Sequence, residues 1–351
     1  MKFPLQIFFI ALSLGVLICE TNAQTYSCKI SGRVLEDATG KPIENVNVYV
    51  SGTIWGTTTD EYGNFSIPNL PSGNHEVVAS IIGYESKTIS VYLKDSTSIK
   101  LTFKLKEAHY ELQSITISGK APAKWKYDLE IFKKRFFGQS SFASDCVIKN
   151  PEVINLKWIN PHHLTAQADE PIIIFNNALG YKINCILVSF DWDSESLRVQ
   201  ATVRPSFTEL TDTTGALKSK WQQNREIAYK GSLDNFLQSV KDNSLTQNGF
   251  QIFLDTGPES LIPERRLRHL WEPLANKTGN EYTISFAGFL RVLYILKDPA
   301  NPETSWIKLL YPFVTLDQYG YPIEALPFDV YGYWAKSGIA DMLPKYYSPV
   351  K

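Results

Sequence analysis

The sequence predicts a β-rich protein in which a small antiparallel β-sandwich is followed by a mixed, mainly antiparallel α+β domain. Three observations predict this class. Short runs that alternate apolar with polar residues recur between residues 28 and 105, and turn-forming residues separate them at nearly regular intervals. Helical periodicity appears only from residue 127 onward, where strand patterns continue beside it.

The strands expected in the first domain share the two-residue period of half-buried strands. Glycine, proline, aspartate and serine cluster between them, as tight turns require. Six or seven strands within about eighty residues are typical of a small sandwich. The expected strands cover residues 29–34, 46–50, 64–67, 77–81, 88–91 and 99–103, and the turns cover 37–42, 60–63, 70–73 and 83–84.

An ordered set of motifs in the same stretch resembles one known family. The motifs are Gly32 with Val34, residues 40–43, residues 46–53, residues 58–65, residues 70–73, and Gly83 with Tyr84. Their order resembles the carboxypeptidase-regulatory-like domain. The resemblance implies a transthyretin-like, seven-stranded sandwich over residues 24–106. That domain is found as an accessory to zinc carboxypeptidases and at the front of many TonB-dependent outer-membrane receptors.

Residues 1–23 have the composition of a secretory signal peptide. An apolar run covers residues 8–18, and residues 21–23 provide a small-residue cleavage site, so we expect an exported protein. A lipid anchor on Cys19 is the alternative, but Ile18 before it is larger than lipoprotein signals prefer. No later stretch approaches the roughly 20 apolar residues of a membrane-spanning helix, so we expect no transmembrane span in the mature chain.

Residues 107–122 are expected to connect the sandwich to the second domain. Residues 112–118 have a strand-like pattern that a turn closes, and this segment resembles the connector that follows the domain in the outer-membrane receptors. Residues 123–351 are too few for a 22-stranded transporter barrel. We therefore expect a protein of the periplasm, outer membrane or cell surface of a Gram-negative bacterium, but not a receptor.

Residues 123–351 are predicted to form the α+β domain. Apolar residues at helical spacing predict helices over 127–137, 218–228 and 232–242, and Ser232 is a suitable N-cap for the third. The long apolar run 181–190 predicts a central strand. Further strands are expected over 154–159, 172–175, 197–203, 250–254, 282–286, 290–296, 306–310 and 314–317, with a short helix near 339–343.

Several pieces of this second region are similar, as a set, to a group of exported proteins that carry the same N-terminal domain. The pieces are 132–138, 150–152, 176–181, 225–236, 248–250, 331–334 and 341–344. The similarity supports an envelope location and implies no catalytic residue.

Composition and cysteine content limit the possible partners. The net charge of −1 gives no basis for nucleic-acid binding, because the densest positive runs, 133–135 and 265–268, are typical of solvated helix faces. Three cysteines follow the leader, Cys28, Cys146 and Cys185, and this odd number excludes complete pairing. Cys185 lies in an apolar run and is expected to be buried, and the sequence identifies no disulfide.

The sequence contains an incomplete zinc motif. His269 and Glu272 have the H-x-x-E spacing of zinc carboxypeptidases, but no histidine follows them to supply the third ligand. His162 and His163 are adjacent, so on a strand their side chains point to opposite faces. Nucleotide-binding and nucleophile-elbow motifs are absent, and we predict no metal and no cofactor.

Tryptophan provides the remaining candidates for ligand contact. The chain contains 8 Trp and 18 Tyr, and four Trp are candidates for exposed stacking platforms: Trp55, Trp192, Trp271 and Trp334. Burial in a β core is the alternative explanation for each of them.

Two functions are therefore expected. The first is a non-catalytic cell-envelope binding or accessory protein whose ligand is an envelope protein or a glycan. The alternative is a metal-dependent, peptidase-like hydrolase with a site around His162, His163, His269 and Glu272.

Overall fold

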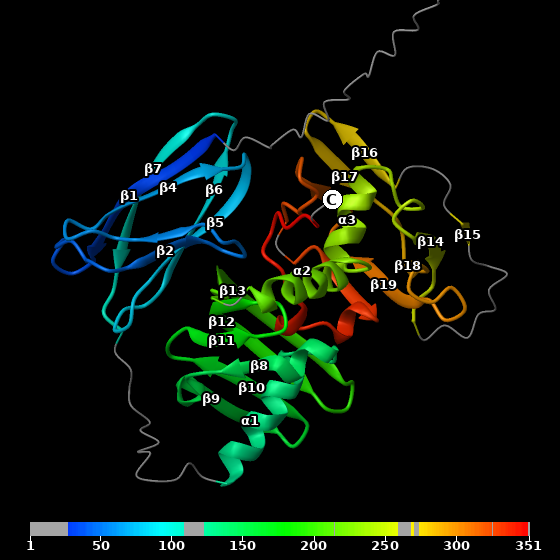
Figure 1. The fold of residues 1–351 in the computed structure, drawn as a ribbon, viewed down its shortest axis with the longest axis horizontal. Coiled ribbons are helices and arrows are strands. Elements are labelled where there is room, and N and C mark those ends of the chain that lie inside the picture. The colour runs from blue at the N-terminus through cyan, green and yellow to red at the C-terminus, as the bar shows by residue number, and fades with distance from the viewer. Residues whose placement is uncertain are drawn as a thin grey trace, which may run out of the picture.

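The computed structural model describes residues 27–108, 123–213, 215–258, 268–269, 274–324 and 326–349. The expected leader, most of the expected connector, and Trp271 and Glu272 lie outside the described residues. Three hydrophobic cores organise the described chain, one in the sandwich, one around a middle sheet and one near the C-terminus. Figure 1 shows these three parts, with the C-terminal segment in red running between them.

The first part confirms the predicted seven-stranded sandwich. One sheet has the order β4-β1-β7 and the other β3-β2-β5-β6. The pairs are antiparallel except for β1 and β7, which run parallel. The strands are β1 (Cys28–Glu36), β2 (Asn47–Val50), β3 (Gly56–Thr58), β4 (Asn64–Leu70), β5 (Gly73–Ser80), β6 (Lys87–Leu93) and β7 (Ser98–Leu105).

Alternation explains why these segments form a sandwich. Ile30, Val34, Val48 and Phe103 are each 0% exposed, and their polar neighbours in sequence point outward. Gly32 permits the close approach of β1 and β7, because a Cβ atom there would lie 1.9 Å from the carbonyl oxygen of Leu101. The short strand β3 was not predicted, since its Gly-Thr-Thr sequence carries no alternating apolar residue.

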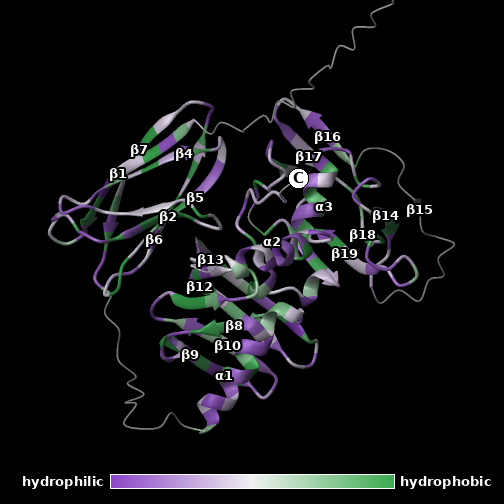
Figure 2. Cartoon of the chain, in the orientation of Figure 1, coloured by the Kyte–Doolittle hydropathy of each residue, from purple (hydrophilic) through white to green (hydrophobic). Residues whose placement is uncertain are grey.

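The second part is a six-stranded sheet covered by helix α1 (Ala123–Phe136). Its main path is β8-β11-β12-β10-β9, and β13 pairs with the other side of β12. The strands are β8 (Cys146–Ile148), β9 (Ile154–Asn160), β10 (His163–Ala168), β11 (Ile172–Asn176), β12 (Tyr181–Asp193) and β13 (Arg198–Glu209). As predicted, the long apolar strand is central, and Figure 2 shows hydrophobic stretches along this sheet.

The third part begins after helix α2 (Ala216–Tyr229). Helix α3 (Leu233–Lys241) starts at Ser232, whose hydroxyl accepts a 3.1 Å hydrogen bond from the Asn235 amide, which confirms the predicted N-cap. Two sheets follow, β15-β14-β18-β19-β21 and β16-β17-β20. Their strands are β14 (Phe250–Asp255), β15 (Arg268–His269), β16 (Ala275–Thr278), β17 (Glu281–Ile284), β18 (Phe289–Tyr294), β19 (Glu303–Leu309), β20 (Val314–Leu316) and β21 (Phe328–Gly332).

The last described residues return to the other two parts. Ile339 and Ala340 are buried in the core of the middle sheet, where the Ala340 carbonyl accepts a 2.9 Å hydrogen bond from the Asn176 side chain. The helix expected near 339–343 is a single 3₁₀ turn, η5 (Ile339–Asp341). Among the described residues, 3₁₀ turns are also formed at η1 (Ser141–Asp145), η2 (Pro151–Val153) and η4 (Trp334–Lys336).

The structure also bears on the cysteines and on membrane insertion. Cys28, Cys146 and Cys185 are each buried and unpaired. Burial raises the pKa of the Cys185 thiol to about 12, in agreement with its predicted place in the apolar core. Within the described residues, no helix combines the length and the apolar character that a membrane crossing needs.

Candidate functional site

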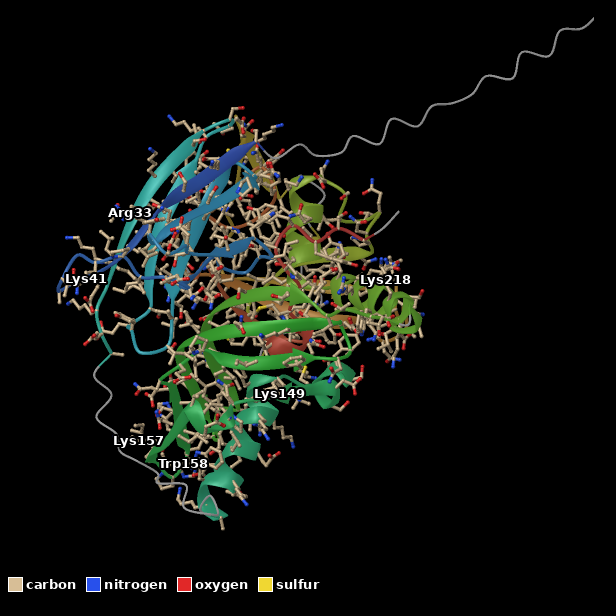
Figure 3. The ribbon with its side chains drawn as sticks, turned by 60° about the vertical axis from the view of Figure 1, so that its left-hand side comes forward. Arg33, Lys41, Lys149, Lys157, Trp158 and Lys218 are labelled. Atoms are coloured by element: carbon tan, nitrogen blue, oxygen red, sulfur yellow. The ribbon has the colours of Figure 1, made fainter. Side chains whose placement is uncertain are left out.

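A cleft of about 620 Å³ lies between the sandwich and the middle sheet. Figure 3 shows the sandwich, which carries Arg33 and Lys41, on one side and the middle sheet with Lys149 and Lys157 on the other. Strands β2, β3 and β5 contribute one wall, and β11, β12 and β13 contribute the other. Two parts of the chain that are far apart in sequence therefore form the site together.

The loop after β2 joins the two walls by strand-like pairing. The Gly52 amide donates to the Pro205 carbonyl at 2.7 Å, and the Phe207 amide donates to the Thr53 carbonyl at 3.0 Å. The loop thus covers part of the open edge of β13. The Lys345 amide donates to the Gly52 carbonyl at 2.7 Å, so the C-terminal segment holds the same loop.

The sandwich wall is the outer face of the sheet that contains β2 and β5. Asn47 and Ser80 are paired across these strands, and both line the cleft. Tyr49 follows on the same face, is 5% exposed, and donates a 3.0 Å hydrogen bond to the Arg204 carbonyl. Burial raises the pKa of Tyr49, so its hydroxyl stays protonated and able to donate.

The opposite wall is formed by the middle sheet and carries four polar side chains, here called the polar grid: Lys182, Asn184, Ser206 and Thr208. Asn184 of β12 lies between Ile173 of β11 and Ser206 of β13, and Lys182 lies beside Thr208. All five residues line the cleft. The intervening residues of β12 point into the core on the other face of the sheet, as a strand requires. These are Tyr181, Ile183 and Cys185.

The polar side chains of the two walls retain their hydrogen-bonding capacity. Within the described part of the chain, no hydrogen bond or ion pair is made by the side chains of Asn47, Ser80, Lys182, Asn184 or Ser206. Ser80 is only 5% exposed, and the two amides and Lys182 stand on walls that face each other. Asn47 is exposed, and Lys182, Asn184 and Ser206 are half-buried, so these polar groups are accessible to a polar ligand in the cleft.

Trp55 is the predicted tryptophan that lines the cleft. Its ring is half-buried, and its centroid is 5.2 Å from that of Tyr346. The Thr53 hydroxyl accepts a 3.0 Å hydrogen bond from the Trp55 amide and donates to the Val50 carbonyl at 2.8 Å. The same loop that joins the walls therefore positions the indole ring, which lines the cleft and packs against the sandwich core.

The expectation of exposed stacking platforms is wrong for Trp192 and Trp334. Each is 6% exposed. Trp192 packs between Trp158 and the guanidinium of Arg135, because β12 directs it towards α1. Trp334 belongs to the C-terminal core, and its Nε1 donates to the Gly231 carbonyl at 2.7 Å. The fourth candidate, Trp271, lies outside the described residues.

The histidines named for a hydrolase are separated. His163 Nε2 is 2.9 Å from an Asp191 carboxylate oxygen, whereas His162 points to Ser194 and Glu195, as adjacent strand residues should. None of these residues lines the cleft. In the described ranges, no group of three or more possible ligands could hold a metal ion. The structure describes no side chain for His269.

A smaller cleft of about 250 Å³ lies between the sandwich and the sheet that contains β17 and β20. Its buried carboxylate, Asp317, accepts hydrogen bonds from the Tyr319 and Tyr321 amides at 2.8 and 2.9 Å. Burial raises the pKa of Asp317, although these hydrogen bonds oppose the effect. We interpret Asp317 as a residue that holds a turn, since its backbone partners lie within four residues.

Sequence reasoning missed every residue of the polar grid. The signal was present, because Lys182 and Asn184 occupy the alternate positions of a strand whose other face is apolar. What the sequence could not supply was the pairing of the two walls, which depends on the loop at Gly52 and the edge of β13.

Known proteins match the N-terminal part of the chain. The CarboxypepD_reg-like domain model matches residues 30–117. The TonB-dependent receptor SusC of Bacteroides thetaiotaomicron is 39% identical over 72 residues, which cover 19% of this chain and 7% of the receptor. The chain therefore corresponds to a small fraction of the length of that relative.

Solved structures show weaker similarity. A 5-hydroxyisourate hydrolase from Klebsiella pneumoniae is 19% identical, covers 23% of this chain and 92% of its own, and has a TM-score of 0.21. A Bacteroides uniformis protein described as carbohydrate binding is 8% identical, covers 83% and 99%, and has a TM-score of 0.20. TM-scores this low support no argument about fold or function. The matched residues 30–117 include most of the seven-stranded sandwich, so this part of the chain is similar to the CarboxypepD_reg-like domain.

Proposed function

We propose that this protein is a non-catalytic binding protein of the cell envelope, and that a glycan occupies the cleft between the sandwich and the middle sheet. One observation carries the proposal. Amide, hydroxyl and ammonium groups without protein partners line two facing walls, and the half-buried ring of Trp55 also lines the cleft. Sugar hydroxyls can pair with such groups, while the apolar face of a sugar ring can pack on an indole.

The shape of the cleft favours a small polar ligand over a folded protein. Its volume of about 620 Å³ lies within the range of small-molecule sites. A folded partner would need a contact surface of about 800 Å² per side, which a concave site of this size does not offer.

The envelope assignment has separate support. Residues 1–23 have a leader-like composition, residues 30–117 are similar to the CarboxypepD_reg-like domain, and part of the chain is similar to a TonB-dependent receptor. The assignment to binding rather than hydrolysis rests on the cleft itself. Among its described lining residues Glu170 is the one carboxylate, whereas most glycoside hydrolases use two.

A glycan array probed with the purified mature chain tests the proposal. We expect wild-type protein to bind a defined set of oligosaccharides and Asn184→Ala to lose about tenfold in affinity, since it removes an amide from the grid. Asn74→Ala is the matched control, because Asn74 is exposed on β5 and lies outside the cleft. An array without any bound glycan would contradict the proposal.

Photo-crosslinking in cells tests the envelope context. A benzoylphenylalanine at Ile82, which is 70% exposed at the cleft, should capture glycan material, and one at Ile159, 55% exposed on β9, should not. Capture of a specific protein from Ile82, together with an empty array, would replace the glycan by a protein ligand.

A further inference from the structure

We infer that the glycan carries an anionic group, and that Lys182 and Lys149 bind this group at one end of the cleft. The inference rests on the proposed function and specifies its ligand. It depends on the distribution of charge along the wall formed by the middle sheet.

Lys182 is the cation within the cleft. It projects from β12 on the face opposite the core, is half-buried, and makes no ion pair within the described residues. Its ammonium group therefore has no carboxylate partner from the described protein. A bound anion would supply the missing partner.

Lys149 is exposed and outside the cleft lining, but its ammonium group lies on the same face of the sheet, near the strand partner of Lys182. Its Nζ lies 5.2 Å from the centroid of the Phe175 ring, and Phe175 is paired with Lys182 across β11 and β12. Paired residues on neighbouring strands share a face and stand about 5 Å apart at Cβ. Lys149 Nζ and the Lys182 side chain therefore lie on the face of the sheet that carries Phe175. Lys149 also lacks an ion pair among the described residues.

The opposite charge lies at the other end of the wall. Glu170 lines the cleft and precedes β11 by two residues. It is five residues from Phe175, the partner of Lys182, which corresponds to about 16 Å of extended chain. Within the described residues Glu170 makes no ion pair with Lys182 or any other cation. The wall thus has Lys182 at one end, Asn184 in the middle and Glu170 towards the other end, where Arg204 forms an ion pair with Glu76.

This arrangement orients an acidic oligosaccharide. Its carboxylate, sulfate or phosphate would accept charge-assisted hydrogen bonds from Lys182 and Lys149. Neutral sugar units would contact Asn184 and Ser206, and repulsion from Glu170 would disfavour the reversed orientation. A uniformly anionic polymer fits less well than a glycan with acidic and neutral units.

Calorimetric titration with matched oligosaccharides tests the inference. The probes are one acidic trisaccharide that the array identifies, its carboxyl-reduced neutral form, and a sulfated neutral trisaccharide. We expect the acidic forms to bind about tenfold more tightly than the neutral form, and this preference to shrink between 50 and 500 mM salt. Comparison of the affinities of the carboxylate-containing trisaccharide and the sulfated trisaccharide identifies which anion the site prefers.

Variants separate the role of charge from that of fold. Lys182→Gln should weaken the binding of acidic probes more than that of neutral probes and so reduce the preference, with Lys149 still present, whereas Lys182→Arg should retain the preference. Lys157→Gln is the control, because Lys157 is exposed on β9 at the far edge of the same sheet (Figure 3). Equal binding of acidic and neutral probes would overturn the inference but leave the proposed function intact, and absence of all glycan binding would overturn both.

Discussion

The hydroxyl of Tyr49 donates a 3.0 Å hydrogen bond to the main-chain carbonyl of Arg204, and so joins the outer face of the sandwich to strand β13. Removal of the hydroxyl in Tyr49→Phe leaves that carbonyl without this partner at a buried interface. We expect a loss of about 1 kcal/mol in the free energy of unfolding, measured by urea denaturation. Tyr62→Phe is the control, because Tyr62 is 60% exposed. Equal stability of the two variants would show that the Tyr49 hydrogen bond has no net effect.

Trp55 should contribute to ligand binding, in addition to its packing against the sandwich core. Its ring is half-buried beside Tyr346 and lines the cleft, so Trp55→Ala removes an apolar platform from the site. We expect an affinity loss of about tenfold for the array-selected glycan, measured by calorimetry. Tyr62→Ala, which truncates an aromatic residue far from the cleft, should bind like wild type. An unchanged affinity in Trp55→Ala would remove Trp55 from the site.

Gly180→Ala should lower the stability of the fold more than Gly40→Ala, although the two glycines have the same backbone conformation. Gly180 and Gly40 have φ values of +71° and +70°, so alanine costs about 1–2 kcal/mol of backbone strain at either position. A Cβ atom at Gly180 would also lie 2.3 Å from the Trp221 ring, whereas nothing lies within 4 Å at Gly40. Thermal unfolding should therefore show Gly180→Ala to be less stable than Gly40→Ala by about 2 kcal/mol. Equal melting temperatures would contradict the packing described around Trp221.

The stability of the sandwich should decrease between pH 7 and pH 5 because His75 is buried. It is 3% exposed, and burial lowers its pKa below the ordinary value of 6.5, although the hydrogen bond between its Nε2 and the Pro71 carbonyl opposes the shift. Below pH 6.5 the unfolded chain binds a proton at His75 that the folded chain does not, so folding stability falls as the pH falls through this range. Urea denaturation at pH 7 and pH 5 should show a smaller decrease for His75→Gln than for wild type. The same decrease in both proteins would exclude His75 as its source.

The sandwich could be predicted from the sequence because each of its strands and turns is specified by residues within that same segment. Strands such as β4 and β7 carry their own alternation, and turns such as 60–63 carry their own chemistry, with the Asp60 carboxylate accepting hydrogen bonds from the Tyr62 and Asn64 amides. The long central strand β12 and the N-cap at Ser232 were predictable for the same reason. Strand β10 was not predicted, because its polar residues interrupt any clear period.

The candidate site could not be predicted in the same way. Trp55 was identified as a tryptophan in a loop, but the same reasoning selected Trp192 and Trp334, which tertiary packing buries. The polar grid depends on register between strands, such as Asn184 beside Ser206, and on a contact between residues about 150 positions apart in sequence, as between Tyr49 and Arg204. Composition and spacing hold no information about such contacts.

Obstruction of the cleft tests the central claim most directly. Asn47 is exposed on β2 and faces the cleft, so Asn47→Trp places an indole ring in the space assigned to the glycan while tryptophan remains favourable in a strand. Lys100→Trp, on the exposed face of β7 in the other sheet of the sandwich, is the matched control. Calorimetry with the array-selected glycan should show no binding to Asn47→Trp and wild-type affinity for Lys100→Trp, with both proteins folded by circular dichroism. Wild-type affinity in Asn47→Trp would show that the glycan does not bind between the sandwich and the middle sheet.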